Sequence, residues 1–291
     1  MSKEIILGTD TEVFLINTKT GVITSAEGII GGSKEKPLAL PSLGDGFAIQ
    51  EDNVMAEFNV PPTSNIEEFK DNIKKILHHI NTNYTNLRAL IKPSANFNII
   101  DLMTPQAQKF GCDPDYNAYL VEQNQPPDPI MFPETRFAGG HIHICLTNHL
   151  GIDYLSYTPD NPLETINGNQ LQLITNLVKF MDFFVGLPAC VLDTDIQRKS
   201  IYGTPGRFRV KPYGLEYRSL SNFWIEDDYL MDLVLTNTKK AVEHALNHDT
   251  VVFDDRFFDE VKSLMLNGTN TQILDFLNHH HVNIKRNELV Q

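Results

Sequence analysis

Hydrophobic and polar positions alternate with a period of two along several short stretches of this chain and repeat at helical spacing along others. Residues 4–16 and 22–26 are rich in β-branched side chains and are separated by the turn sequence N-T-K-T-G, which predicts a hairpin. Residues 47–60 are strand-like again, and Pro61 and Pro62 end that predicted strand. We therefore expect the N-terminal part of the chain to form a sheet.

A helix is predicted directly after the two prolines. It should begin near Asn65, with Thr63 or Ser64 as its N-cap and Glu67 and Glu68 in its first turn. Its apolar side chains recur at helical spacing, so this face should lie on the sheet; they are Ile66, Phe69, Ile73, Ile76, Leu77 and Ile80.

The second half of the chain is predicted to be mainly helical. Residues 110–133 are rich in Pro, Asp and Asn and predict a long ordered loop, and a largely buried helix should span residues 170–185. Further helices are expected after Trp224, at residues 228–246, 255–266 and 271–278. This order predicts an α+β fold in which helices pack on one face of a mainly antiparallel sheet. We expect a single domain over residues 1–291, with residues 225–291 as its helical C-terminal part.

Composition narrows the possible partners and compartments. A chain of 291 residues that is 41% hydrophobic can bury a substantial core. Its net charge of -13 argues against general nucleic-acid binding and against an anionic membrane surface. We find no signal peptide and expect no stretch of about 20 apolar residues that would span a bilayer. The odd number of cysteines, without a C-x-x-C pair, favours a reducing compartment, so a cytoplasmic protein is expected.

Charged side chains gather on one face of each strand-like stretch. Because successive side chains of a strand point to opposite faces, residues two apart in the sequence lie together. The sets that share a face are Asp10 and Glu12; Glu57 with Asn53, Met55 and Asn59, and Glu51 at its start; His141 and His143; Arg207, Arg209 and Lys211; and Glu216 and Arg218.

Each set has a plain structural explanation when it is taken alone. Asp10 and Glu12 fit a solvated strand, Glu57 fits a hydrogen bond to a neighbouring loop, and the basic strand fits an edge protected against aggregation. Together, however, carboxylates and imidazole suit Mg²⁺ or Mn²⁺, and arginines suit phosphate oxygens. The combination predicts a site for a metal and a nucleoside triphosphate, with His141 as a metal or phosphate ligand. Gly139 and Gly140 would then let the nucleotide approach the strand.

Six motifs in this order resemble the carboxylate–amine ligases (amidoligases), particularly the type 2 branch carried by bacteriophages, which are relatives of glutamine synthetase and glutamate–cysteine ligase. The motifs are GTDTEVF, GGSKEKP, QEDNVMAEFNVPP, FGCDPDYNAY, AGGHIHI and YGTPGRFRVKPYGLEYRSLSNFW, and they cover residues 5–226. The resemblance implies a curved antiparallel sheet whose concave face holds the metals and whose convex face carries the helices.

The resemblance also implies a role for each motif residue. Metal ligands would be Glu12, Glu57, His141 and Glu216, with Asp10 standing where the family has Glu. His143 would lie near the phosphates, and Arg218 would steady the transferred phosphoryl group. The phosphate arginines would come from Arg198, Arg207 and Arg209, whose separate roles stay open. Lys34 in the glycine-rich turn would touch substrate or phosphate, although a simple flexible turn explains it as well.

The activity implied is ATP-dependent amide formation through an acyl phosphate, with Mg²⁺ or Mn²⁺. The substrates would be a small-molecule or peptide carboxylate and an amine, in the cytoplasm of the host cell if the chain is phage-encoded. A metal-dependent hydrolase of an amide or phosphoester is the alternative enzyme, since a carboxylate–histidine site can activate water. A third possibility is a non-catalytic nucleotide-binding relative. Cys112 is interpreted as a structural thiol rather than a nucleophile.

Overall fold

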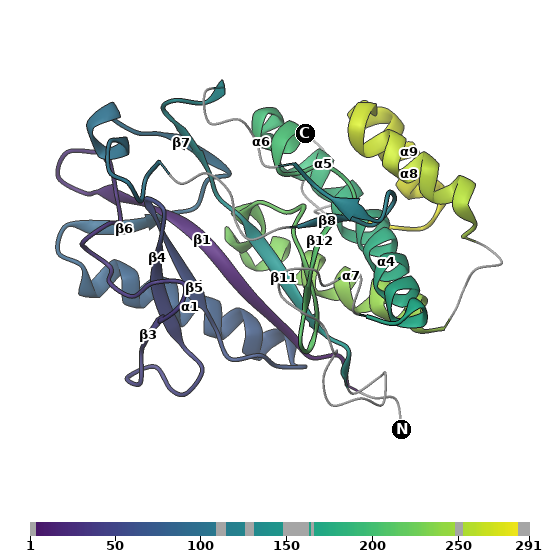
Figure 1. The fold of residues 1–291 in the computed structure, drawn as a ribbon, viewed down its shortest axis with the longest axis horizontal. Helices are drawn as coiled ribbons and strands as arrows, with labels where there is room; N and C mark the ends of the chain where they lie inside the picture. The colour runs from purple at the N-terminus through teal and green to yellow at the C-terminus, as the bar shows by residue number, and fades with distance from the viewer. Residues whose placement is uncertain are drawn as a thin grey trace.

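A large antiparallel sheet organises the protein. The computed structural model describes residues 4–108, 115–125, 131–147, 163, 166–247 and 253–284. The main sheet has the strand order β3-β4-β5-β1-β11-β13-β12-β8-β9, and β2 and β6 also pair with β1 (Figure 1). Its strands are β1 (Leu7–Asn17), β2 (Ile23–Thr24), β3 (Leu38–Ala39), β4 (Ala48–Asp52), β5 (Met55–Asn59), β6 (Leu87–Leu90), β8 (Tyr116–Asn117), β9 (Glu122–Gln123), β11 (Gly140–Cys145), β12 (Arg207–Lys211) and β13 (Gly214–Tyr217). With the helices described below, this confirms the predicted α+β class.

Strand β1 is the centre of this sheet. Its first half pairs with β5 on one side and β11 on the other, and its second half pairs with β2 and β6. The predicted hairpin between residues 4–16 and 22–26 is confirmed by the pairing of Ile16 with Ile23.

The stretch 47–60 was predicted as one strand, and that prediction is wrong. It folds into β4 and β5, joined by a two-residue turn at Asn53 and Val54. Asn53 has a φ of 56°, a conformation that asparagine tolerates in tight hairpin turns. The turn changes which side chains share a face: Glu51 now lies opposite Ala56, whereas Asp52 lies opposite Met55, on the face of Glu57.

The helix after the two prolines, α1 (Ile66–Asn83), forms as predicted, but its N-cap is different. Asn65 caps it by accepting a hydrogen bond from the Glu68 N–H, which replaces the expected Thr63 or Ser64. The predicted apolar face is buried at Phe69, Ile73, Ile76 and Ile80.

The predicted helix at 170–185 is longer than expected and contains a wide turn. It begins as α4 (Gly168–Met181), continues as the π-helical η3 (Asp182–Gly186) and ends as α5 (Leu187–Leu192). By length and hydropathy, Gly168–Leu192 is able to cross a membrane, so the expectation that no such stretch exists is wrong. The most apolar window of this helix is 78% buried inside the protein, which is the behaviour of a core helix.

The helices expected after Trp224 are confirmed. They are α7 (Asp228–Leu246), α8 (Asp255–Asn267) and α9 (Asn270–His279). The remaining elements are α6 (Ile196–Ile201), η1 (Ile99–Leu102), η4 (Asn222–Ile225) and a small sheet of β7 (Ser94–Asn96) and β10 (Thr135–Phe137).

The two faces of the main sheet have different chemistry. One face carries apolar side chains such as Phe58, Ile142 and Leu215, which join the buried faces of α1, α4 and α7 in one core cluster. The other face carries the charged residues of β1, β5, β11, β12 and β13. Farther along β1 on that face, Phe14 packs against Phe97 of the segment after β7, with ring centroids 5.8 Å apart. The small sheet therefore packs beside the charged region.

Candidate functional site

The strand register brings the predicted charged residues together on one face. Across β1 and its neighbours, Asp10 lies opposite His141, and Glu12 lies opposite Glu57. Farther along the sheet, Glu216 lies opposite His143 on one side and opposite Arg209 on the other. Side chains from five strands, far apart in the sequence, therefore form one continuous polar surface.

Glu12, Asp52 and Glu57 form a group that we call the acidic cluster. One carboxylate oxygen of each lies within 4.8 Å of the others. The Gly139 N–H donates to Glu12 at 2.6 Å, and the Gln50 amide donates to Glu57 at 2.9 Å. Burial, followed by repulsion from Asp52, raises the pKa of Glu12 to about 8, and burial, followed by repulsion from Asp10, raises the pKa of Glu57 well above its ordinary value. The cluster thus brings three carboxyl groups together, and the raised pKa values favour the neutral forms of Glu12 and Glu57.

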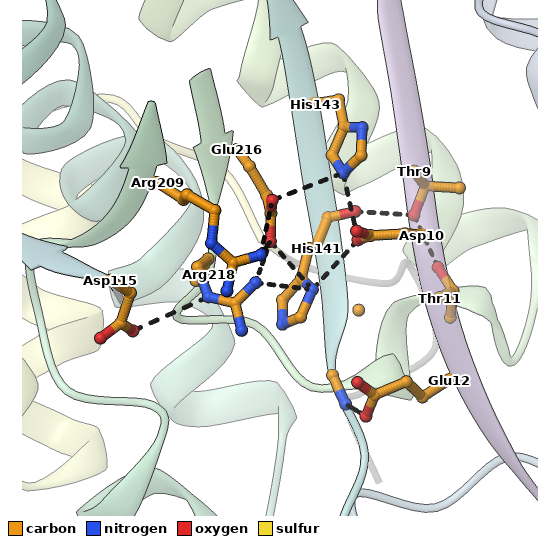
Figure 2. Close-up of polar contacts among 12 residues, drawn as sticks. Thr9, Asp10, Thr11, Glu12, Asp115, His141, His143, Arg209, Glu216 and Arg218 are labelled. Atoms are coloured by element: carbon orange, nitrogen blue, oxygen red, sulfur yellow. Dashed lines mark hydrogen bonds and ion pairs between the residues drawn. The ribbon is translucent and has the colours of Figure 1, made fainter. Parts of the chain in front are cut away.

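Asp10, His143 and Glu216 form a second group, the histidine cluster. Their ligand atoms also lie within 4.8 Å of one another. The Nε2 atom of His143 lies 3.1 Å from the Asp10 carboxylate and 4.0 Å from that of Glu216 (Figure 2). Burial acts to raise the pKa of Asp10, but His143 and then His141 outweigh it and hold that pKa well below its ordinary value.

Three cationic side chains surround the carboxylate of Glu216, which is fully buried. Lys211 Nζ lies 2.8 Å from one oxygen, and an Arg209 nitrogen lies 3.3 Å from the same oxygen. Arg218 donates to the other oxygen, so Glu216 and Arg218, which were predicted to share a face, also form an ion pair. The ends of β12 and β13 thus compensate the charge of the histidine cluster.

His141 lies between the two clusters. Its Nδ1 is 3.0 Å from Asp10 and 3.4 Å from both Glu216 and Arg218 (Figure 2). Burial, followed by the nearby Arg218, lowers the pKa of His141 to about 3, so the imidazole is neutral near pH 7. A neutral imidazole is the form that binds metals.

The two glycines before His141 are required by the protein itself. A Cβ on Gly139 would lie 2.4 Å from the Nε2 of His141, and one on Gly140 would lie 2.3 Å from the Ser221 carbonyl oxygen. The space that was expected to admit a nucleotide is therefore filled by the chain's own atoms. The glycines let the His141 ring fold back over the strand and let the segment around Ser221 pack against it.

Asp115 links two of the predicted phosphate arginines. Its carboxylate lies 3.3 Å from Arg207 Nε and 3.7 Å from Arg218 Nε. Arg207 also donates to the Ile201 carbonyl and lies over the Tyr202 ring, 5.7 Å from its centroid.

A cavity of about 70 Å³ opens beside these guanidinium groups and the acidic cluster. Its lining combines carboxylates, guanidiniums and aromatic walls, and it includes Glu12, Asp52, Asp115, Arg136, Phe137, His141, Tyr202, Arg207 and Arg218. A substrate bound there would touch both the acidic cluster and the cationic groups.

Arg198 and Lys34 were both predicted to bind the cofactor, but only Arg198 lines the cavity. The guanidinium of Arg198 is buried and donates to the carbonyls of Ala138, Ser219 and Leu220 at 2.8, 3.0 and 2.5 Å. Those contacts tie the start of β11 to the segment after β13, which favours a structural role. Lys34 is exposed in the turn closed by the Ser33–Lys36 bridge, outside both clusters and outside the cavity lining. Cys112, predicted to be a structural thiol, lies outside the described residues.

The donor sets of both clusters fit divalent cations. Three carboxylates with hard oxygen atoms are the ligands that Mg²⁺ and Mn²⁺ prefer, and the raised pKa values of Glu12 and Glu57 reflect repulsion that a cation would relieve. The histidine cluster adds one nitrogen, which first-row transition ions such as Mn²⁺ accept. Buried polar atoms normally have hydrogen-bond partners. Among the described residues, the buried Nε2 of His143 has no such partner, and it lies beside the Asp10 carboxylate, as expected of a ligand atom.

Sequence reasoning missed Asp52 and the turn residue Tyr213, whose hydroxyl lies 2.7 Å from the Nδ1 of His143. Asp115 lies in the motif FGCDPDYNAY, but no separate role was predicted for it. For Asp52 a signal exists: reading Asn53 and Val54 as a two-residue hairpin turn places Asp52 on the face of Glu57. For Asp115 and Tyr213 the only local signals are turn sequences, so their contacts follow from the tertiary fold.

Residues 166–290 match the family model described as Phage phiEco32-like COOH.NH2 ligase-type 2. The match covers less than half of the chain and supports the resemblance to carboxylate–amine ligases that the motifs indicate. Carboxylate–amine ligases act on a carboxylate and an amine, as the family's description states. No curated protein matches the chain.

The matched part contains Glu216 and its cationic neighbours together with the C-terminal helices, whereas Glu12, Glu57 and His141 precede it. The resemblance derived from the motifs covered residues 5–226, and the match extends this resemblance to the helices after Trp224. The strand pairing of β1 and β11 with β13 is what joins the earlier residues to the matched part.

Proposed function

We propose that this carboxylate–amine ligase uses ATP and Mg²⁺ or Mn²⁺ to form an amide or peptide-like bond through an acyl phosphate. The observation that carries the proposal is the arrangement of the polar face. Two clusters of metal-type ligands lie on either side of His141, and guanidinium groups adjoin both of them. A metal and a triphosphate need both kinds of group, since cations bridge phosphate oxygens and arginines hold the remaining charge.

The proposed reaction has two steps. A carboxylate oxygen of the first substrate attacks the γ-phosphorus of ATP, and the bond between that phosphorus and the ADP oxygen breaks. The amine nitrogen of the second substrate then attacks the acyl carbon, inorganic phosphate leaves, and the nitrogen loses a proton. A bound divalent cation supplies charge neutralisation along the triphosphate.

The chain's own residues would position these groups. Glu12, Asp52 and Glu57 would hold one cation, and Asp10, His143 and Glu216 a second. Arg218 and Arg209 would stabilise negative charge that develops on the transferred phosphoryl group, an effect worth on the order of 100- to 1,000-fold in rate per contact. The cavity beside Arg207 and Tyr202 would admit the carboxylate substrate.

The proposal extends to the setting of the reaction. The substrates would be small molecules or a peptide, and the whole of residues 1–291 would act as one catalytic domain. The odd cysteine count, without a C-x-x-C pair, favours the cytoplasm, of the host cell if the chain is phage-encoded.

The test is ADP release from ATP and Mg²⁺ in mixtures of carboxylates and amines, with hydroxylamine added to convert an acyl phosphate into a hydroxamate. We expect ADP and hydroxamate to form only when a carboxylate is present. Glu57→Gln and Glu216→Gln should abolish both products, whereas Glu243→Gln, an exposed residue of α7, should leave them unchanged.

Other outcomes distinguish the alternatives. Amide or phosphoester hydrolysis without ATP would favour a metal-dependent hydrolase. Binding of a nucleotide with Mg²⁺ in calorimetry, without any turnover, would favour the non-catalytic nucleotide-binding relative. No binding would refute both that relative and the ligase proposal.

A further inference from the structure

The two-residue turn between β12 and β13, together with Lys211 directly before it, contacts two of the three members of the histidine cluster. The turn consists of Pro212 and Tyr213, and Lys211 and Gly214 pair on either side of it. It is anchored to the end of β11, because the Leu146 N–H donates to the Tyr213 carbonyl at 2.7 Å. A Cβ on Gly214 would lie 2.2 Å from the Ile144 carbonyl oxygen, so the close approach requires glycine. The side chains on this turn are therefore held at a defined distance from the cluster.

Tyr213 contacts the imidazole of His143 in two ways. Its hydroxyl lies 2.7 Å from Nδ1, and the two rings stack with centroids 5.8 Å apart. The opposite ring atom, Nε2, is the one directed at Asp10. For Nε2 to bind a cation, the proton of the neutral ring must sit on Nδ1, where the Tyr213 oxygen can accept it. The geometry therefore suits a residue that orients a metal-binding histidine.

Lys211 contacts the carboxylate of Glu216 at the same place. Its ammonium lies 2.8 Å from Oε2, the Glu216 oxygen that is nearer to His143. The ammonium group of Lys211 thus lies beside a carboxylate oxygen to which a divalent ion would have to bind. The side chain of Lys211 is 23% exposed, against 10% for Arg209 and 6% for Arg218. Of the three cations beside Glu216, Lys211 is the one with a flexible stem and access to solvent.

We propose that this turn controls the histidine cluster as a cation site: Tyr213 positions His143 as a nitrogen ligand, and Lys211 occupies the cation position on Glu216 until a divalent ion displaces it. The inference rests on the proposed function, which places a divalent cation at this cluster. It adds that the two side chains act in opposite directions, since Tyr213 favours the divalent ion and Lys211 competes with it.

The test measures Mn²⁺ binding to the full-length protein without nucleotide, with free Mn²⁺ followed by electron paramagnetic resonance. All proteins in this experiment carry Glu57→Gln. This change weakens cation binding at the acidic cluster, so that the measured Mn²⁺ affinity reports on the histidine cluster. We expect Lys211→Met to tighten Mn²⁺ binding about tenfold and Tyr213→Phe to weaken it about 10- to 100-fold, the scale seen when partners of metal-binding histidines are removed.

Matched variants separate a local effect from a general one. Lys211→Arg keeps the competing charge and should bind Mn²⁺ like the parent protein. Lys74→Met removes an equal charge from the exposed ion pair with Asp228, and Tyr229→Phe removes a hydroxyl bonded to the Ile284 carbonyl. Both should leave Mn²⁺ affinity unchanged.

The inference is overturned if Lys211→Met and Tyr213→Phe shift the affinity in the same direction, or if neither shifts it. It is also overturned if neither the parent nor Lys211→Met binds Mn²⁺. Opposite shifts, when the protein that retains Glu57 releases no ADP, would support the inference and refute the proposed function. ADP release without those shifts would do the reverse.

Discussion

Glu12 and Glu57 face each other across the neighbouring strands β1 and β5, and their carboxylates share one buried group with Asp52. Like charges directly opposite on adjacent strands destabilise a sheet. Burial raises the pKa of both side chains, which shows that the metal-free protein favours their protonated forms. An arrangement that costs stability in this way is typical of a functional site, which supports the proposed cation site.

The acidic cluster predicts opposite effects of Glu57→Gln with and without metal. In metal-free buffer at pH 7, we expect the variant to be more stable than the parent by about 1 kcal/mol, because a neutral amide replaces a carboxyl whose charged form is disfavoured by burial and by neighbouring carboxylates. Added Mn²⁺ should stabilise the parent and have a much smaller effect on the variant. Urea unfolding at several Mn²⁺ concentrations measures both effects. Equal stabilisation of the two proteins by Mn²⁺ would place the ion elsewhere.

The buried carboxyl of Asp182 predicts a pH dependence of stability. Burial raises the pKa of Asp182 from 3.8 to about 7, although the Tyr217 hydroxyl, 2.7 Å away, opposes this change. A carboxyl whose pKa is higher in the folded state contributes stability below pH 4 and loses it as the pH rises toward 7.

Asp182→Asn should remove this loss of stability, which is on the order of 3 kcal/mol between pH 4 and pH 7. The free energy of unfolding, measured from pH 4 to 8, should fall less steeply in the variant than in the parent. Parallel curves would show that Asp182 titrates normally.

Arg198 predicts a loss of stability rather than of nucleotide affinity. Arg198→Met would leave the carbonyls of Ala138, Ser219 and Leu220 without their donor in a buried place. Each buried group left unsatisfied costs about 1–3 kcal/mol, so we expect a large drop in the free energy of unfolding. Arg88→Met, on the exposed side of β6, serves as the control. If the variant kept normal stability but no longer bound ATP, the predicted role of Arg198 as a phosphate ligand would be supported instead.

Arg218 predicts a loss of rate with the fold retained. Arg218→Lys keeps the positive charge beside Glu216 but loses the planar donor group that also reaches His141 and Asp115. We expect ADP release to fall by on the order of 100-fold, because one electrostatic contact to the phosphoryl group is misplaced. Arg256→Lys, at a side chain that is 93% exposed, should be silent. Unchanged turnover in Arg218→Lys would exclude a direct role for this guanidinium.

The sequence by itself determined the class of fold and the kinds of side chain at the site. Alternation with a period of two is a local property. The sequence alone therefore predicted that Asp10 and Glu12 share one face of their strand, and that His141 and His143 share one face of theirs. Helical spacing in the same way predicted α1 and the C-terminal helices, because burying an amphipathic face is what stabilises each of them.

Only the tertiary structure decided which of those side chains meet. A two-residue turn at Asn53 exchanges Glu51 for Asp52 on the polar face, because shifting a strand by one residue sends every side chain to the other side. The separation of the acidic cluster from the histidine cluster depends on the register of β1 against β5 and β11. Arg198 is one more basic residue in the sequence, but in the fold it bonds backbone carbonyls. These outcomes depend on contacts between residues far apart in the chain, and local patterns carry no information about such contacts.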